Sequence, residues 1–254
     1  KMPRGNFGEI RAFQDFLGSY EDVTWAANAD MDLNGGWFAV SVNEGTIQNV
    51  VDEEGGIVQF LTDTGDNDAI ALVSGPFKPS NGGCVTEARF KIADDLNVAV
   101  FAGFSETLNT DTPVMPAEYA STTMTINGSG GVAGLQYDLD GTNPDVFRPA
   151  SGDGGAVTGT NKKGTAITAT TTTSSGQTVT ADKFVVARVE ISPSGRIEYL
   201  LAADEDLTQV ESITGAVNAD DLFFAVLMLE NREAAAKEFE VDYVYARGFR
   251  DWTA

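Results

Sequence analysis

The chain has 254 residues, of which 42% are hydrophobic, and its 38 Asp and Glu residues against 16 Lys and Arg give a formal net charge of −22. A charge of this sign repels phosphate backbones and anionic lipid, so we expect no binding to nucleic acid or to membranes. The chain has no histidine, which excludes Ser-His and Cys-His catalysis, and its one cysteine, Cys84, cannot form an internal disulfide.

The composition predicts one all-β domain. The 27 glycines, together with many Val, Thr and Phe residues, favour strands and tight turns. We expect no signal peptide, and no apolar run reaches the roughly 18 residues that a membrane span needs. The expected organisation is an N-terminal arm over 1–9, one β-sandwich over 10–249 with a Gly- and Thr-rich insertion at 151–182, and a C-terminal tail over 250–254.

The first predicted elements are strands. The spacing from Ile10 to Phe16 is helical, but the run at 37–42 that follows is typical of a strand, and we favour extended structure here. Short apolar runs at 57–62 and 69–73 predict two further strands joined by an acidic turn.

This acidic turn is a candidate calcium site. Asp63, Asp66 and Asp68 offer hard oxygen ligands, and Ca²⁺ takes six to eight oxygens. The spacing does not match an EF-hand, and Asp, Asn and Gly are also the residues that an ordinary β-turn uses. The sequence leaves both interpretations open.

The middle of the chain predicts a hairpin and a variable segment. Apolar and charged residues alternate at 86–92, an apolar run follows at 98–104, and together they predict a β-hairpin. The segment 132–140 is typical of a short strand. Within the insertion, the threonines at 168–173 favour a β-arm or a loop that either contacts another subunit or is merely exposed.

The segment 184–201 gives the sharpest structural prediction. Its apolar residues share one parity on both sides of a three-residue loop, in which Pro193 suits the first corner and Gly195 the left-handed position. A slip of one residue would mix the two faces, so the register is fixed. The predicted apolar pairs are Ile191 with Ile197, Val189 with Tyr199, and Ala187 with Leu201.

The last elements are a buried strand, a closing strand and a tail. The run 222–229 is apolar on both parities, as for a strand covered on both faces, and 239–245 alternates as a strand should. The tail carries arginines and aromatic residues, which dominate interface energetics. Its candidate partner contacts are Arg247, Phe249, Arg250 and Trp252, although packing against their own domain is equally compatible with the sequence.

The order of these segments resembles a known fold. The sequence segments that carry the resemblance are GIVQFLTDTGDND at 56–68, TEARFKI at 86–92, VAVFAGFSE at 98–106, YDLD at 137–140, RVEISPSGRIEYLL at 188–201 and FEVDYVYARGF at 239–249. They resemble concanavalin A-like, laminin-G-like jelly rolls, and in particular the jelly-roll virion proteins of tailed bacteriophages, which decorate the capsid or form head and tail fibres. The resemblance covers roughly residues 50–249 and implies two curved antiparallel sheets stacked face to face.

Relatives with this fold include glycoside hydrolases whose catalytic strand carries E-x-D-x-E or E-x-D-x-x-E. The nearest match is Glu240-Val241-Asp242, but Val244 and Tyr245 stand where the last glutamate should be, so we expect no catalytic residues. We expect no redox role for Cys84, because it stands at the start of a predicted strand, where a small half-buried residue fits the packing. Trp37 and Tyr137 are candidate groove aromatics that the sequence does not distinguish from core residues.

The resemblance and the missing catalytic machinery together predict a non-enzymatic virion structural protein without a cofactor. The expected role is capsid decoration on the outer capsid surface, with the major capsid protein as partner and a homo-oligomer, such as a trimer at a symmetry axis, as the assembly. The alternative is a carbohydrate-binding receptor-recognition domain of a head or tail fibre. A secreted hydrolase is the least favoured class.

Overall fold

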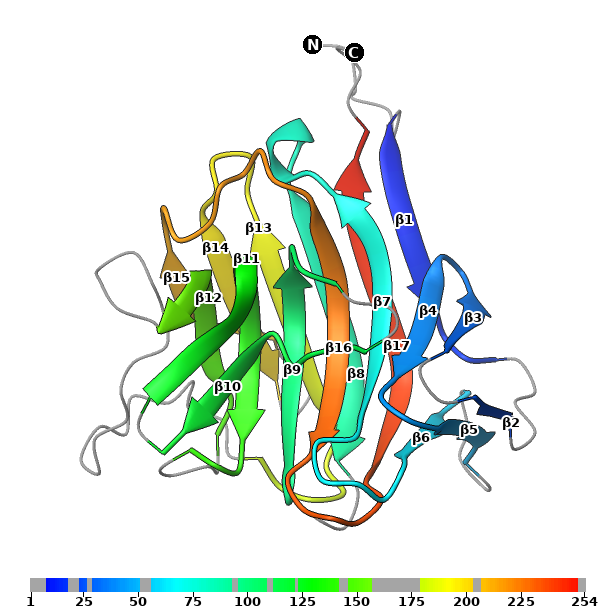
Figure 1. Ribbon diagram of the computed structural model, residues 1–254. Coiled ribbons are helices and arrows are strands. Elements are labelled where there is room, and N and C mark those ends of the chain that lie inside the picture. The colour runs from blue at the N-terminus through cyan, green and yellow to red at the C-terminus, as the bar shows by residue number, and fades with distance from the viewer. Residues whose placement is uncertain are drawn as a thin grey trace.

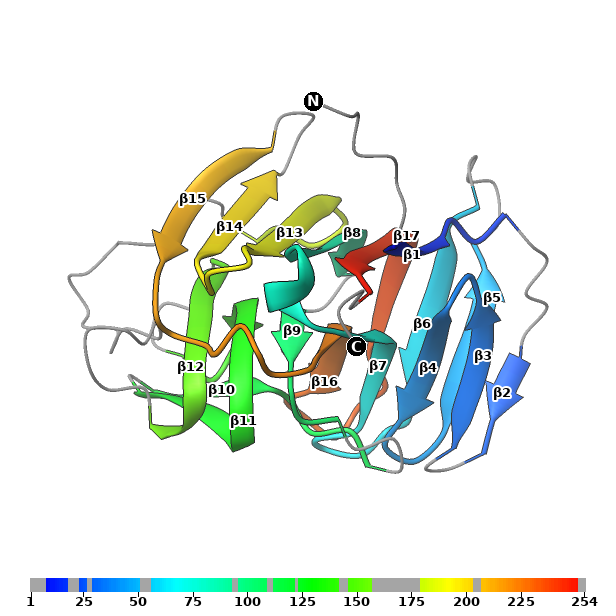
Figure 2. The same cartoon turned by 90° about the horizontal axis from the view of Figure 1, so that it is seen from above.

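The computed structural model describes most of the chain. The described residues are 8–17, 23–26, 29–50, 56–92, 96–108, 112–121, 123–141, 146–156, 179–202 and 207–250. They form two antiparallel sheets packed face to face, which confirms the predicted all-β sandwich (Figures 1 and 2).

One layer is a nine-stranded sheet. Its strand order is β15-β14-β13-β8-β17-β6-β5-β2, and β1 also pairs with β17. The strands are β1 (Glu9–Gln14), β2 (Val23–Trp25), β5 (Gly45–Asn49), β6 (Val58–Thr62), β8 (Cys84–Ile92), β13 (Val185–Ile191), β14 (Ile197–Ala202), β15 (Thr208–Ile213) and β17 (Glu238–Phe249).

The other layer is an eight-stranded sheet. Its order is β10-β11-β9-β16-β7-β4-β3, and β12 also pairs with β11. The strands are β3 (Asp30–Asn34), β4 (Trp37–Ser41), β7 (Ala69–Phe77), β9 (Val98–Ser105), β10 (Ala117–Ala120), β11 (Thr123–Asp138), β12 (Arg148–Ala156) and β16 (Phe223–Asn231). A short 3-10 helix, η1 (Pro79–Asn81), lies between β7 and β8.

The main core fills the space between the sheets, where inward residues alternate with outward ones along each strand. Phe60 and Phe239 stack with ring centroids 5.4 Å apart, and Phe77 meets Phe104 edge to face. The layers are also joined by a hydrogen bond, since the buried Tyr199 hydroxyl of β14 donates to the Ala150 carbonyl of β12 at 3.4 Å.

A second apolar cluster covers part of the outer face of the eight-stranded sheet. Phe101, Val226 and Met228 point outward from β9 and β16 and pack under Met115 and Met124. The covering segment is the stretch before β10 together with the first half of β11, which Figure 1 shows crossing in front of the sheet. Strand β16 is therefore buried on both faces, as its sequence predicts.

The predicted hairpin of β13 and β14 is confirmed in its register. Ile191 pairs with Ile197, Val189 with Tyr199, and Ala187 with Leu201. Ser192 donates its N–H to the Arg196 carbonyl at 2.8 Å, and Gly195 has φ +76°. The loop therefore has the three-residue length and the left-handed glycine that the sequence predicts.

The predicted hairpin of 86–92 with 98–104 is wrong. Both segments are strands, but β8 pairs with β13 and β17 in one sheet, while β9 pairs with β11 and β16 in the other. The chain crosses between layers after β8, and alternation along a strand carries no information about which layer it joins.

The strand predicted over 132–140 is also longer than expected. β11 spans 16 residues and contains a register shift between Ile126 and Gly131. Glycine tolerates a bulge, so the strand bends here instead of ending. The bend carries the first half of β11 away from β9 to pair with β10.

The described residues cover only parts of the predicted arm, insertion and tail. β1 begins at Glu9, β12 extends to Ala156 into the predicted insertion, and 157–178 lie outside the described residues. No helix among the described residues is long and apolar enough to cross a membrane.

Candidate functional site

A groove lies on the outer face of the eight-stranded sheet, over β3, β4, β7 and the start of β16. Its cavity volume is about 260 Å³, close to the lower end of ordinary ligand pockets, roughly 300 Å³. The lining residues are Asp30, Phe38, Val40, Val73, Ser74, Gly75, Leu108 and Phe224.

Strand alternation places an aromatic side chain in this groove. On β4, Trp37 and Ala39 point into the core, so Phe38 and Val40 point outward. Phe38 is directly opposite Val73 of β7 in the register, and 42% of its surface is exposed. Phe224 closes the other side from β16, which is two strands away.

The polar groups of the groove are few. Ser74 donates its hydroxyl to the Gly36 carbonyl at 2.7 Å, and Asp30 is exposed on the edge strand β3 opposite Val40. An ionised aspartate only accepts hydrogen bonds, so Asp30 can receive them from hydroxyl or amine donors. The groove therefore suits a small ligand with an apolar face and hydroxyl groups at its rim.

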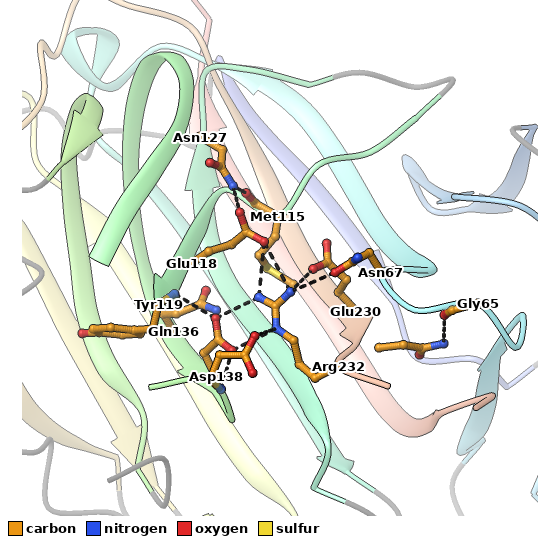
Figure 3. Close-up of polar contacts among 12 residues, drawn as sticks. Gly65, Asn67, Met115, Glu118, Tyr119, Asn127, Gln136, Asp138, Glu230 and Arg232 are labelled. Atoms are coloured by element: carbon orange, nitrogen blue, oxygen red, sulfur yellow. Dashed lines mark hydrogen bonds and ion pairs between the residues drawn. The ribbon is translucent and has the colours of Figure 1, made fainter. Parts of the chain in front are cut away.

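A buried ion cluster lies beyond the other end of β16 and is centred on Arg232 (Figure 3). Its Nε donates to Asp138 Oδ1 at 2.9 Å and its Nη2 to Asp138 Oδ2 at 2.8 Å, a bidentate pair. It also pairs with Glu118 at 3.3 Å and with Glu230. The Arg232 side chain is 4% exposed and that of Asp138 is 0% exposed.

The Arg232 cluster joins segments that are distant in sequence. Glu118 comes from β10, Asp138 from the end of β11 and Glu230 from β16. Asp138 also accepts the N–H of Tyr119 at 2.9 Å, and Glu118 accepts the side-chain amide of Asn127. The cluster thereby fixes β10 and β11 at the edge of the eight-stranded sheet.

Burial raises the pKa of Glu230 to about 7, because Arg232 compensates only in part and the carboxylates of Glu118 and Asp138 repel its charge. Burial likewise raises the pKa of Asp140. A polar hollow of about 280 Å³ opens beside these groups, lined by Glu118, Tyr119, Ala120, Thr125, Asn127, Asp140 and Arg232. The charged residues that line this hollow already pair with one another. We therefore assign them a structural role, which is to hold the strands together.

The predicted calcium ligands do not converge. Asp63 accepts the N–H of Thr64 at 2.7 Å, Asp66 is exposed, and Asp68 is buried and accepts the N–H of Gly65 at 2.5 Å and the side-chain amide of Asn43. Across the described ranges, no group of three or more His, Cys, Asp and Glu side chains could hold a metal ion. The turn geometry thus explains these aspartates, and calcium binding stays a prediction that a calcium-dependent rise in melting temperature would support.

Glu240 and Asp242 lie on the outer face of the nine-stranded sheet, remote from the groove. Glu240 pairs with Lys91 at 2.9 Å and Asp242 with Arg89 at 2.5 Å. The register shift between Val241 and Tyr243 returns Val244 to the core. Each carboxylate therefore has its own basic partner.

The predicted tail contacts are placed in part. Arg247 and Phe249 belong to β17 and pair with β1, and the Phe249 ring packs over Gly82. Arg250 donates its N–H to the Gly8 carbonyl at 2.7 Å, whereas Trp252 lies outside the described residues. These contacts are within the domain, and a partner contact of the four residues stays a prediction.

The other residues singled out from the sequence are core residues. Trp37 and Tyr137 are each 1% exposed, so neither lines a groove. Cys84 is buried at the start of β8, and burial raises the pKa of its thiol, which disfavours the reactive thiolate.

Sequence reasoning missed both Phe38 of the groove and Arg232 of the cluster. The parity of the run 37–42 could have identified Phe38, because Trp37 and Phe38 must point to opposite faces of one strand. No local pattern identifies Arg232, since its partners are brought together only by the pairing of distant strands.

Comparisons with known proteins establish the fold. No protein-family profile matches the chain, and no curated protein matches its sequence. A Shewanella oneidensis MR-1 protein of unknown function matches with a TM-score of 0.57 and 13% identity, covering 97% of this chain and 89% of that one. Peanut lectin matches with a TM-score of 0.53 and 12% identity, covering 91% of this chain and 99% of that one. The Emp47p carbohydrate recognition domain matches with a TM-score of 0.50 and 11% identity, covering 97% of this chain and 99% of that one. The chain has a concanavalin A-like sandwich fold.

Proposed function

We propose that this protein is a non-enzymatic carbohydrate-binding domain that holds a neutral glycan in the groove of Phe38 and Phe224. The groove is the observation that carries the proposal, because it exposes aromatic surface and a hydrogen-bond acceptor at one concave place. The lectin and the carbohydrate recognition domain that share the fold add support. The fold alone would not suffice, since one fold hosts many functions.

The chemistry of a sugar fits this groove. The C–H face of a pyranose ring is apolar and packs on aromatic and aliphatic side chains such as Phe38, Val73 and Leu108, while its hydroxyls donate to Asp30. The volume of about 260 Å³ suits one or two sugar rings. The net charge of −22 and Asp30 itself disfavour sialylated and uronic-acid glycans.

Glycan-array screening followed by calorimetry tests the proposal. We expect a neutral glycan to bind with a dissociation constant below about 1 mM, and Phe38→Ser to weaken it at least about tenfold, or roughly 1.4 kcal/mol. Leu207→Ser, at a partly exposed apolar residue just before β15, is the control and should bind as the parent does. Failure of every neutral glycan to bind, or equal binding by Phe38→Ser, would overturn the proposal.

Absence of cleavage belongs to the same proposal. Glu240 and Asp242 are paired with Lys91 and Arg89 on the far face, so neither carboxyl reaches the groove. Prolonged incubation with the bound glycan should release no reducing sugar from either the parent or Glu240→Gln. Release by the parent that Glu240→Gln abolishes would make the protein a hydrolase.

Decoration of a phage capsid is the second candidate function, with the major capsid protein as partner. It is supported by the resemblance of the strand segments to those of jelly-roll virion proteins and by the high negative charge. The comparisons identify no phage virion protein. Quantitative mass spectrometry of purified phage particles distinguishes capsid decoration from a role in a fibre. Copies in proportion to the capsid protein would favour decoration, a few copies per particle would favour a fibre that binds a host glycan, and no copies would remove both.

A further inference from the structure

The outer face of the nine-stranded sheet differs in charge from the rest of this acidic molecule. Six of the chain's 16 basic residues are ion-paired there: Arg11, Arg89, Lys91, Arg188, Arg196 and Arg247. Their partners are Glu9, Glu87, Glu190, Glu198, Glu240 and Asp242, with Asp182 a further 3.8 Å from Lys91. We name this surface, over β1, β17, β8, β13 and β14, the paired face.

The formal charges of these pairs nearly cancel, so almost the whole net charge of −22 lies elsewhere on the chain. Two copies of a protein with such a charge repel each other, and the repulsion reaches over about 8 Å at physiological salt. The paired face is the surface that two copies could bring together with the least repulsion. The strands that carry the paired face lie in the upper part of Figure 2.

Aromatic side chains, one of them exposed, lie at the β1 edge of the paired face. Phe13 of β1 is 49% exposed, and its ring centroid lies 6.2 Å from that of Tyr243 and 6.5 Å from that of Tyr245. A half-exposed Phe is costly to leave in water and is a typical interface anchor. The rings are inclined by 43° and 65°, so they do not form the flat platform on which a sugar chain would stack.

The size and pattern of the paired face suit contact with a second copy. Five adjacent strands about 4.8 Å apart and roughly 20 to 40 Å long present on the order of 600 Å², which is at the lower end of the roughly 600–1,000 Å² per partner of a standard interface. A twofold contact brings one patch against itself, and a patch with alternating charges offers each arginine a carboxylate of the other copy.

We propose that the paired face is the interface of a homodimer, formed around Phe13, Tyr243 and Tyr245. The two copies meet on their nearly neutral faces, which turns the glycan grooves outward in opposite directions. The proposal is independent of the ligand of the groove, because the groove lies on the other sheet.

Sedimentation velocity of the full chain, over a hundredfold range of concentration at physiological salt, tests this. We expect a dimer that dissociates on dilution, and Phe13→Asp should weaken association at least tenfold by placing a charge beside the aromatic rings of Tyr243 and Tyr245. Val114→Asp, at a 59% exposed apolar residue on the covering segment of the opposite face, is the control and should associate as the parent does.

Arg11→Glu provides a second variant that does not touch the aromatic packing, since its side chain is 56% exposed. It should also weaken association. A monomeric parent at every concentration, or unchanged association in folded Phe13→Asp and Arg11→Glu, would overturn the proposal. A loss of glycan binding in a Phe13→Asp variant that still associates as the parent does would also overturn it and would assign the aromatic residues to a ligand.

Discussion

Arg232 shows at the residue scale how this fold tolerates buried charge. It forms a bidentate pair with the fully buried Asp138 and also contacts Glu118 and Glu230. A buried carboxylate without such a partner would be strongly destabilising. The single guanidinium of Arg232 is shared among several carboxylates, however. It therefore offsets the cost of burying the Glu230 charge only in part, and the pKa of Glu230 rises to about 7.

This shift predicts a pH dependence. The folded pKa of about 7 exceeds the ordinary value of 4.5, so the folded state binds the proton more tightly. The contribution of Glu230 to stability is therefore fully present below about pH 4.5 and is lost as pH rises through about 7. Glu230→Gln keeps an acceptor for Arg232 and removes this loss, so its stability relative to the parent should rise by on the order of 2 kcal/mol between pH 5 and 8.

Urea unfolding of both proteins at several pH values measures this difference. Glu198→Gln is the control, because Glu198 pairs with Arg196 on a partly exposed surface, and we expect its difference from the parent to stay nearly constant over this range. A difference that is the same at pH 5 and pH 8 for Glu230→Gln would contradict the assigned burial of its charge.

At the scale of elements, the β13–β14 hairpin depends on one glycine. Gly195 has φ +76°, and a Cβ at this position would lie 3.0 Å from the Val217 carbonyl oxygen. Left-handed backbone costs an ordinary residue about 1–2 kcal/mol. The hairpin supplies two adjacent strands of the nine-stranded sheet, so strain in its loop acts on that sheet.

Gly195→Ala should lower the free energy of unfolding by about 1–2 kcal/mol. Ser194→Ala changes the exposed neighbouring residue of the same loop and should stay within about 0.5 kcal/mol. Thermal and urea unfolding give both values. Equal stabilities of the two variants would show that the loop relaxes without strain.

The whole molecule is governed by its charge and by its two unlike outer faces. One face carries the groove and the covering segment, and the other carries the ion pairs with Phe13 at their margin. The excess acids repel one another in the compact state more than in the extended chain. Salt therefore acts on stability in two opposed ways, through this repulsion and through the ion pairs.

We expect repulsion to dominate, because most ion pairs of the paired face are partly exposed and such pairs each contribute at most about 1 kcal/mol. The free energy of unfolding should increase as NaCl shortens the Debye length from about 30 Å at 0.01 M to about 3 Å at 1 M. KCl at equal ionic strength should act alike, which separates screening from binding of a specific ion. A decrease with salt would show that the ion pairs of the paired face outweigh the repulsion among the acids.

Local patterns in the sequence were enough to predict the all-β class, the position of most strands and the register of the β13–β14 hairpin, because period-2 alternation and turn chemistry are local properties. The three-dimensional structure was needed to show that β8 and β9 belong to different sheets, that Phe38 and Phe224 share a groove, and that Arg232 meets Glu118 and Asp138. These relations join residues far apart in the chain, and they depend on which strands pair and how a glycine-rich strand bends. Alternation along a strand shows which side chains share a face, but the pairing of distant strands sets which side chains meet there.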